Sequence, residues 1–153
     1  MGGMKTMFDA ERVAEIEGRI ALLRADAPAL WGKMTAAQVM EHCCRGMEMA
    51  TGDNQLPRVF VGRLLGPMIK GMAVRTDNPM RKNSPTAPAL VVTGEPDFEA
   101  GRERLVGLID KFAAGGDAGC TTWPHAFFGK LTPEEWAGLM YKHLDHHLRQ
   151  FGV

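Results

Sequence analysis

The chain has 153 residues, the size of one ordinary domain, and a chain of this length buries enough surface to fold without disulfide bonds. With 45% hydrophobic and 24% charged residues, its composition is globular, which excludes disordered, collagen-like and disulfide-rich classes. The 18 basic and 18 acidic side chains balance, so we expect no nucleic-acid partner bound through overall charge.

Membrane and secretion signals are not visible in the sequence. The apolar runs are shorter than the ~20 residues of a membrane span, and even residues 59–65 contain Arg63. The first residues lack the apolar stretch of a secretory signal, so we expect a soluble protein without membrane partners in the default compartment, the cytoplasm. Cys43, Cys44 and Cys120 are then predicted to be free thiols, since neighbours in one helix cannot form a bridge.

The first two helices are predicted from apolar spacing and from capping residues. Residues 9–24 carry apolar side chains three and four positions apart, with Asp9 as a plausible N-cap. Thr35 followed by Gln38 forms a capping box, which predicts a second helix over residues 36–50. The inward stripe of this helix is mostly small, which either permits close helix packing or leaves room for a ligand.

A long crossover is predicted over residues 51–95. It is rich in proline and contains a short helical candidate near residues 58–72. Up to residue 94, six basic side chains stand against Asp53 and Asp77, a surplus of four positive charges. Two interpretations are open: a solvated connecting surface, or a rim that attracts an anionic cofactor or substrate.

Two further helices complete the prediction. Asp97 can cap a helix that ends near residue 114, where Gly115 and Gly116 terminate it, and a loop of about 17 residues follows. Thr132, followed by Pro and two Glu residues, predicts a last helix over residues 133–150. Four long helices with one long connection predict an all-α protein, a four-helix bundle with a crossover.

The last helix carries two histidines where core residues are expected. His143 and His147 are four residues apart on its apolar stripe, so their side chains lie about one turn apart and can hold one metal ion. His42 lies ~9 Å inside the start of the second helix, and the His143/His147 midpoint lies ~7.5 Å inside the end of the last. Antiparallel packing of these helices would bring all three histidines to one level. Three imidazoles with a vacant position are typical of a catalytic zinc-type site, whereas core or surface histidines are the alternative.

Other polar residues near this pattern have weaker assignments. His146 is turned about 100° away from the His143/His147 edge and is left out of the ligand set. His125 precedes the last helix and is a possible pocket-wall residue, while Gln150 is a possible hydrogen-bond partner of a ligand. Asp145 is a second candidate for such a partner, but a solvent-facing position is favoured for it. Leu144 stands where zinc proteases of the His-Glu-x-x-His type have their general base, so the sequence identifies no catalytic residue.

The sequence resembles the DinB/YfiT-like metalloprotein superfamily, and most closely a bacterial branch of unassigned function. A histidine early in the second helix is combined with a C-terminal His-x-x-His-His, followed by Arg-Gln. The resemblance spans nearly the whole chain, through residues 31–35, 41–43, 83–88, 127–136 and 143–150.

The resemblance implies a single DinB-like domain over residues 1–153, a bundle of up-down-down-up type. It also implies a divalent metal, zinc or nickel, bound by His42, His143 and His147. Many members of the superfamily are homodimers, so the resemblance implies a homodimer here. Characterised members include transferases and isomerases that use mycothiol, bacillithiol or glutathione, so a thiol cofactor is implied by analogy.

The leading hypothesis is a metal-dependent enzyme that activates a low-molecular-weight thiol for S-transfer to a small-molecule substrate. Arg75 and Arg81 of the basic crossover are predicted to bind the carboxylates of that thiol. One alternative is a metal-dependent hydrolase. The other is a non-catalytic metal-binding or stress-response module, in which the histidines hold a structural metal or only pack.

Overall fold

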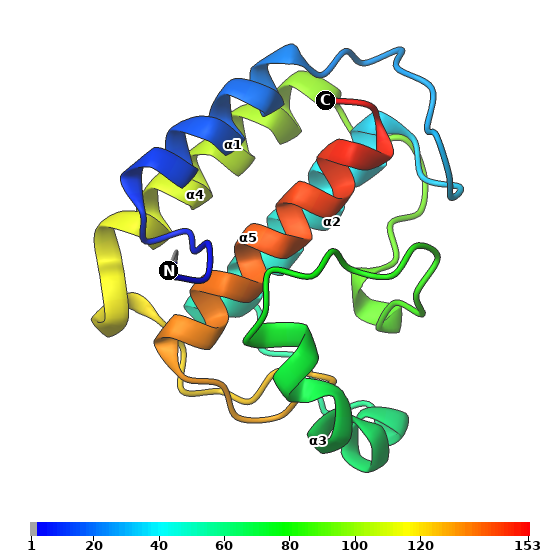
Figure 1. The fold of residues 1–153 in the computed structure, drawn as a ribbon. Helices are drawn as coiled ribbons and strands as arrows, with labels where there is room; N and C mark the ends of the chain where they lie inside the picture. The colour runs from blue at the N-terminus through cyan, green and yellow to red at the C-terminus, as the bar shows by residue number, and fades with distance from the viewer. Residues whose placement is uncertain (1–2) are drawn as a thin grey trace.

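The computed structural model describes residues 3–153, and over this range it is all-helical, without a β-strand (Figure 1). The helices are α1 (Ala10–Leu22), α2 (Ala36–Thr51), α3 (Phe60–Val74), the 3₁₀ helix η1 (Pro88–Leu90), α4 (Phe98–Gly119) and α5 (Pro133–Gln150). The four predicted long helices and the short crossover helix are therefore present. None of the described helices combines the length and the apolar character needed to cross a membrane.

Side-chain caps start the four long helices where the sequence predicted them. Asp9 and Asp97 accept hydrogen bonds from backbone N–H groups in the first turns of α1 and α4. Thr35 and Thr132 form complete capping boxes with Gln38 and Glu135 at α2 and α5. Each cap satisfies N–H groups that have no partner within the helix, which fixes these starting points locally.

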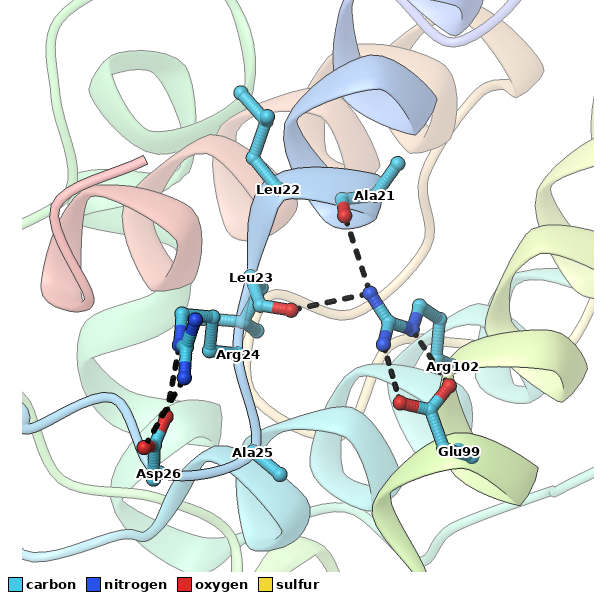
Figure 2. Close-up of a pocket in the computed structure, with 8 residues that line it drawn as sticks. All are labelled: Ala21, Leu22, Leu23, Arg24, Ala25, Asp26, Glu99 and Arg102. Atoms are coloured by element: carbon cyan, nitrogen blue, oxygen red, sulfur yellow. Dashed lines mark hydrogen bonds and ion pairs between the residues drawn. The ribbon is translucent and has the colours of Figure 1, made fainter.

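The end of α1 is capped by a side chain from α4. Arg102 donates hydrogen bonds to the carbonyl oxygens of Ile20, Ala21 and Leu23, and it also binds Glu99. Figure 2 shows its contacts with Ala21, Leu23 and Glu99. These contacts line a surface pocket of about 410 Å³. Because the charged groups that line this pocket are paired with one another or with backbone oxygens, we interpret it as a helix cap and not as a ligand site.

The predicted end of α4 at Gly115 and Gly116 was only partly correct. Gly116 has φ 54° and ψ −149°, so it interrupts the helical backbone as a glycine at a helix end does. The chain then resumes a helical conformation to Gly119, across a kink. As a result, the connection to α5 is shorter than expected and covers residues 120–132.

Helices α1, α2, α4 and α5 pack around one hydrophobic core, with α1 and α5 running opposite to α2 and α4 (Figure 1). The antiparallel pairing of α2 with α5 is visible at both ends. Gln150 at the end of α5 donates to the carbonyl of Trp31, just before α2. At the other end, Thr121 donates to the carbonyl of Ala50 near the end of α2, and the neighbouring Cys120 thiol donates to the carbonyl of Pro133, the first residue of α5. This pairing is the one that the depth of the histidines required.

Candidate metal centre

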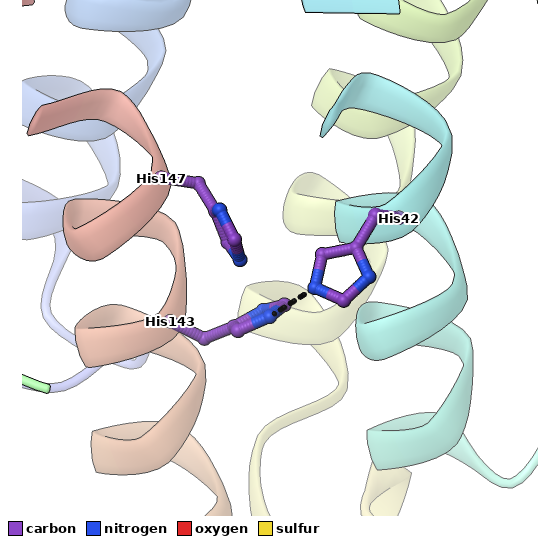
Figure 3. Close-up of side chains that lie close together, drawn as sticks. All are labelled: His42, His143 and His147. Carbon is purple, nitrogen blue, oxygen red and sulfur yellow. Dashed lines mark hydrogen bonds between the residues drawn. The ribbon is translucent and has the colours of Figure 1, made fainter. Parts of the chain in front are cut away.

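Three histidines from two helices converge in the interior (Figure 3). His42 comes from α2, and His143 and His147 come from α5. One ring nitrogen of each lies within 4.8 Å of the corresponding nitrogens of the other two. The Nε2 atoms of His42 and His143 are 2.9 Å apart. The structure therefore brings together the three residues that the sequence predicted as metal ligands, and this group could hold a metal ion.

A glycine on α2 makes room for the ring of His143. A Cβ atom at Gly46 would lie 3.1 Å from Cε1 and 3.2 Å from Nδ1 of that ring, closer than nine in ten real Cβ contacts. Gly46 is one helical turn after His42 on the same face of α2. The small residue in the inward stripe of α2 thus leaves room for a histidine of the candidate site.

Hydrogen bonds orient two of the rings. Nδ1 of His42 lies 2.9 Å from the carbonyl oxygen of Leu90, and Nδ1 of His147 lies 2.8 Å from Oε1 of Gln150. The Gln150 amide nitrogen donates to the carbonyl of Trp31, so its oxygen is left as the acceptor. Both Nδ1 atoms must then carry the proton, and both Nε2 atoms keep a lone pair for a metal.

Burial keeps all three imidazoles neutral. Loss of hydration lowers the pKa of His42, lowers the pKa of His143 well below its usual value and lowers the pKa of His147 to about 3. The neighbouring histidines contribute to the lowered pKa values of His143 and His147. Neutral imidazole is the form that binds metals, so the donor set fits zinc, nickel or a similar divalent ion.

The two residues predicted near the ligands have different positions. Gln150 is the hydrogen-bond partner of His147. His125 lies in the 120–132 loop, where its Nδ1 accepts from the backbone N–H groups of Phe127 and Phe128, and its ring packs on Trp136. Burial, together with the charge of the nearby Arg58, lowers the pKa of His125 to about 4. His125 therefore holds the loop against the start of α5, outside the group of three histidines.

The two arginines predicted to bind a cofactor make no contact with the three histidines among the contacts that the structure gives for the described residues. Nε of Arg75 binds Glu135 at 2.8 Å, near the start of α5 and ~12 Å along the helix from His143. The backbone carbonyl of Arg81 accepts a hydrogen bond from the Ser84 hydroxyl. Their assignment to a thiol carboxylate stays a prediction.

The sequence did not reveal the backbone group that orients His42. Arg45, one turn after His42, donates to the carbonyls of Ala89 and Val91 and so holds η1 on α2 with Leu90 in place. Every residue has a backbone carbonyl, so the sequence cannot indicate which one accepts from His42. The basic residue one turn after the buried histidine is a feature that could have been noted.

Aromatic and basic side chains adjoin His147 on the other side. The ring of His146 lies 5.0 Å from that of His147 and contacts Trp31 at 5.6 Å. The ammonium of Lys82 lies 4.3 Å from the Trp31 ring centre. Lys82 is therefore a cation of the basic crossover that contacts Trp31, the aromatic neighbour of His146, and the sequence had not singled it out.

Comparison with known proteins gives a family and no activity. No curated protein and no solved structure matches the chain. A family model described as "Protein of unknown function (DUF1569)" matches residues 6–152, which include all three histidines. The chain therefore belongs to the DUF1569 family.

Proposed function

We propose that this protein binds one divalent metal ion, zinc or nickel, through Nε2 of His42, His143 and His147, and that it is an enzyme of thiol S-transfer. The observation that carries the proposal is the convergence of three neutral imidazoles, two of which have their Nδ1 atoms engaged by oxygen acceptors. Such prior orientation of ligands is characteristic of metal sites.

Three protein ligands favour a catalytic over a structural role, because structural zinc sites usually have four. A divalent ion in such a site lowers the pKa of a coordinated thiol or water and so supplies a nucleophile at neutral pH. The protein's own contribution is to fix the imidazoles and to limit access of bulk water. His42 and His147 are only 3% and 7% exposed.

The composition of the site supports an external thiol as the nucleophile. The group of three histidines contains no carboxylate that could act as a general base for water. Burial raises the pKa of Cys43 and raises that of Cys44 to about 12, so neither cysteine supplies a thiolate at neutral pH. Hydrolysis by the same site is the alternative, and it predicts turnover without any added thiol.

We also propose that the fold is the up-down-down-up bundle of the DinB/YfiT-like superfamily. Three observations support this relationship: the antiparallel α2 and α5, the long crossover between α2 and α4, and the placement of the three histidines. The parallel course of α2 and α4 follows from the pairing of Arg104 with Glu41 and of Lys111 with Asp53.

The first experiment is the metal content of tag-free protein, measured by elemental mass spectrometry. We expect about one ion per chain in the wild type and a loss of that ion in His42→Ala. His146→Ala is the matched control, because His146 lies beside His147 but outside the group. Metal retained in His42→Ala, or absent from the wild type after reconstitution, would overturn the site.

The second experiment separates the possible roles of a bound metal. Metal-loaded protein is assayed against small electrophiles and esters with and without glutathione, mycothiol or bacillithiol. Thiol-dependent turnover supports S-transfer, whereas thiol-independent turnover indicates hydrolysis. No turnover together with a large fall in melting temperature on chelation would indicate a structural metal in a non-catalytic module.

A further inference from the structure

Helix α3 exposes an unusual amount of apolar surface. Phe60 and Met68 are 74% and 79% exposed, although both are large hydrophobic residues. The exposed apolar residues of α3 are Phe60, Val61, Leu64, Leu65, Met68, Ile69 and Met72, which we call the α3 face. At about 100° per residue, these positions cover one half of the helix, and no charged residue of α3 falls among them.

The opposite side of α3 is the side that packs on the protein. A Cβ atom at Gly62 would lie 2.6 Å from the carbonyl oxygen of Phe127, and Gly66 approaches the same oxygen still more closely. Lys70 and the C-cap residue Arg75 both bind Glu135 of α5. Because glycines and an ion-pair cluster fill the inner side, the α3 face is directed away from the core. Helix α3 itself lies at the edge of the molecule, apart from the other long helices (Figure 1).

The area of the α3 face matches that of a protein interface. Its seven side chains together expose on the order of 800 Å², which is about what one partner contributes to a standard-size interface. The largest apolar patch on a typical monomer is ~300–600 Å². The α3 face is thus larger than a monomer commonly leaves in contact with water.

The charges around α3 favour a second copy of the chain over a lipid surface. A helix that lies on an anionic membrane needs free basic side chains along its edge. Here Lys70 and Arg75 are engaged by Glu135, and Arg58 donates to the carbonyl of Phe127. Among the described residues of α3, Arg63 is the exposed cation without an ion pair. One free cation is fewer than the cluster of about four to eight basic residues that is typical of lipid-binding segments. In a twofold-symmetric dimer, each subunit contributes the same surface to the interface. Because the α3 face contains no charged residue, two such faces can pack together without charge repulsion.

We propose that two copies of this chain associate through their α3 faces to form a symmetric homodimer. The proposal does not depend on the metal or on the chemistry of the histidines. It assigns a location to the homodimer that the sequence resemblance implied only in general.

The test is the molar mass in solution, measured by light scattering after size exclusion. We expect twice the 16.8 kDa of one chain for the wild type at micromolar concentration. The Leu64→Glu/Met68→Glu variant should have the mass of one chain. Leu22→Glu, at an equally exposed leucine on α1, is the matched control and should remain dimeric. Far-ultraviolet circular dichroism and the melting temperature report whether the variants fold.

Three outcomes would overturn the proposal. A wild type that is monomeric throughout the micromolar range is the first. A folded Leu64→Glu/Met68→Glu variant that remains dimeric is the second. The third is a monomeric wild type that binds phosphatidylserine-containing vesicles and loses this binding in the variant, which would assign the α3 face to a lipid surface. If the double variant does not fold, the single variant Phe60→Ser is measured in its place.

Discussion

Helices α3 and α5 both follow a helical apolar pattern, but they place that pattern on opposite sides. In α5, the apolar stripe is buried, and His143 and His147 stand within it. In α3, the apolar residues face outward, and the glycines Gly62 and Gly66 form the packed side. Periodicity therefore predicts that a segment is helical, whereas the buried side depends on what the rest of the chain offers as a packing surface.

The sharpest way to break the α2–α5 arrangement is to fill the space at Gly46. We expect Gly46→Val to displace the His143 ring, because even a Cβ atom there lies 3.1 Å from it. The predicted loss in metal affinity is about 100-fold, the upper end of what is seen when ligand orientation is disturbed. Titration with zinc under competition from a chelator measures this.

The same substitution should also destabilise the metal-free protein, by roughly 1–3 kcal/mol, through overpacking. Gly107→Val is the matched control, since a Cβ atom at Gly107 meets nothing within 4 Å. Equal metal affinity in Gly46→Val and in the control would show that the ring of His143 does not need this space.

The loop under α3 provides a prediction about acid stability. An unfolded histidine has a pKa near 6.5, whereas burial lowers the pKa of His125 to about 4. The folded protein thus binds fewer protons than the unfolded chain between these values. The stability that neutral His125 contributes is complete above pH ~6.5 and is lost as the pH falls towards ~4, by up to about 3 kcal/mol.

The variant that isolates this effect is His125→Asn. Its side-chain oxygen can accept the N–H groups of Phe127 and Phe128 as Nδ1 does, but it does not titrate. We expect this variant to be less stable than the wild type near neutral pH, because it loses the packing on Trp136. Its free energy of unfolding should fall less than that of the wild type between pH ~7 and ~4. Urea titrations at several pH values measure both, and parallel pH profiles would contradict the prediction.

The sequence predicted most of the fold because the boundaries of the long helices are set locally. Thr132 and Pro133 start α5 whatever lies around them. The depths of His42 in α2 and of His143 and His147 in α5 indicated that an antiparallel packing of these helices would bring the three histidines together. The outward direction of α3 could not be predicted, since it depends on Phe127, 60 or more residues away. The carbonyl of Leu90 was equally hidden, because every residue has one.

Two glycine substitutions in α3 should have effects of opposite sign. Gly62→Ala forces a methyl group against the backbone of Phe127, which lies 2.6 Å from the position of the new atom. We expect a loss of roughly 2 kcal/mol and easier proteolysis within residues 52–75. Gly71→Ala meets nothing within 4 Å and should instead stabilise α3, by up to ~1 kcal/mol, through helix propensity. Melting temperatures that move in the same direction in both variants would refute the assignment of the packed side.

The smallest expected effect is at the hydrogen bond between Gln150 and His147. Gln150→Leu removes the oxygen 2.8 Å from Nδ1, so the ring of His147 loses its fixed tautomer and orientation. We expect a fall in zinc affinity of about 10-fold with His147 itself still present. Gln150→Glu retains an oxygen acceptor at Nδ1, although it loses the donor to the carbonyl of Trp31, and should bind zinc nearly as tightly as the wild type. A comparable loss in both variants would mean that Gln150 acts by joining α5 to Trp31, and not by orienting a ligand.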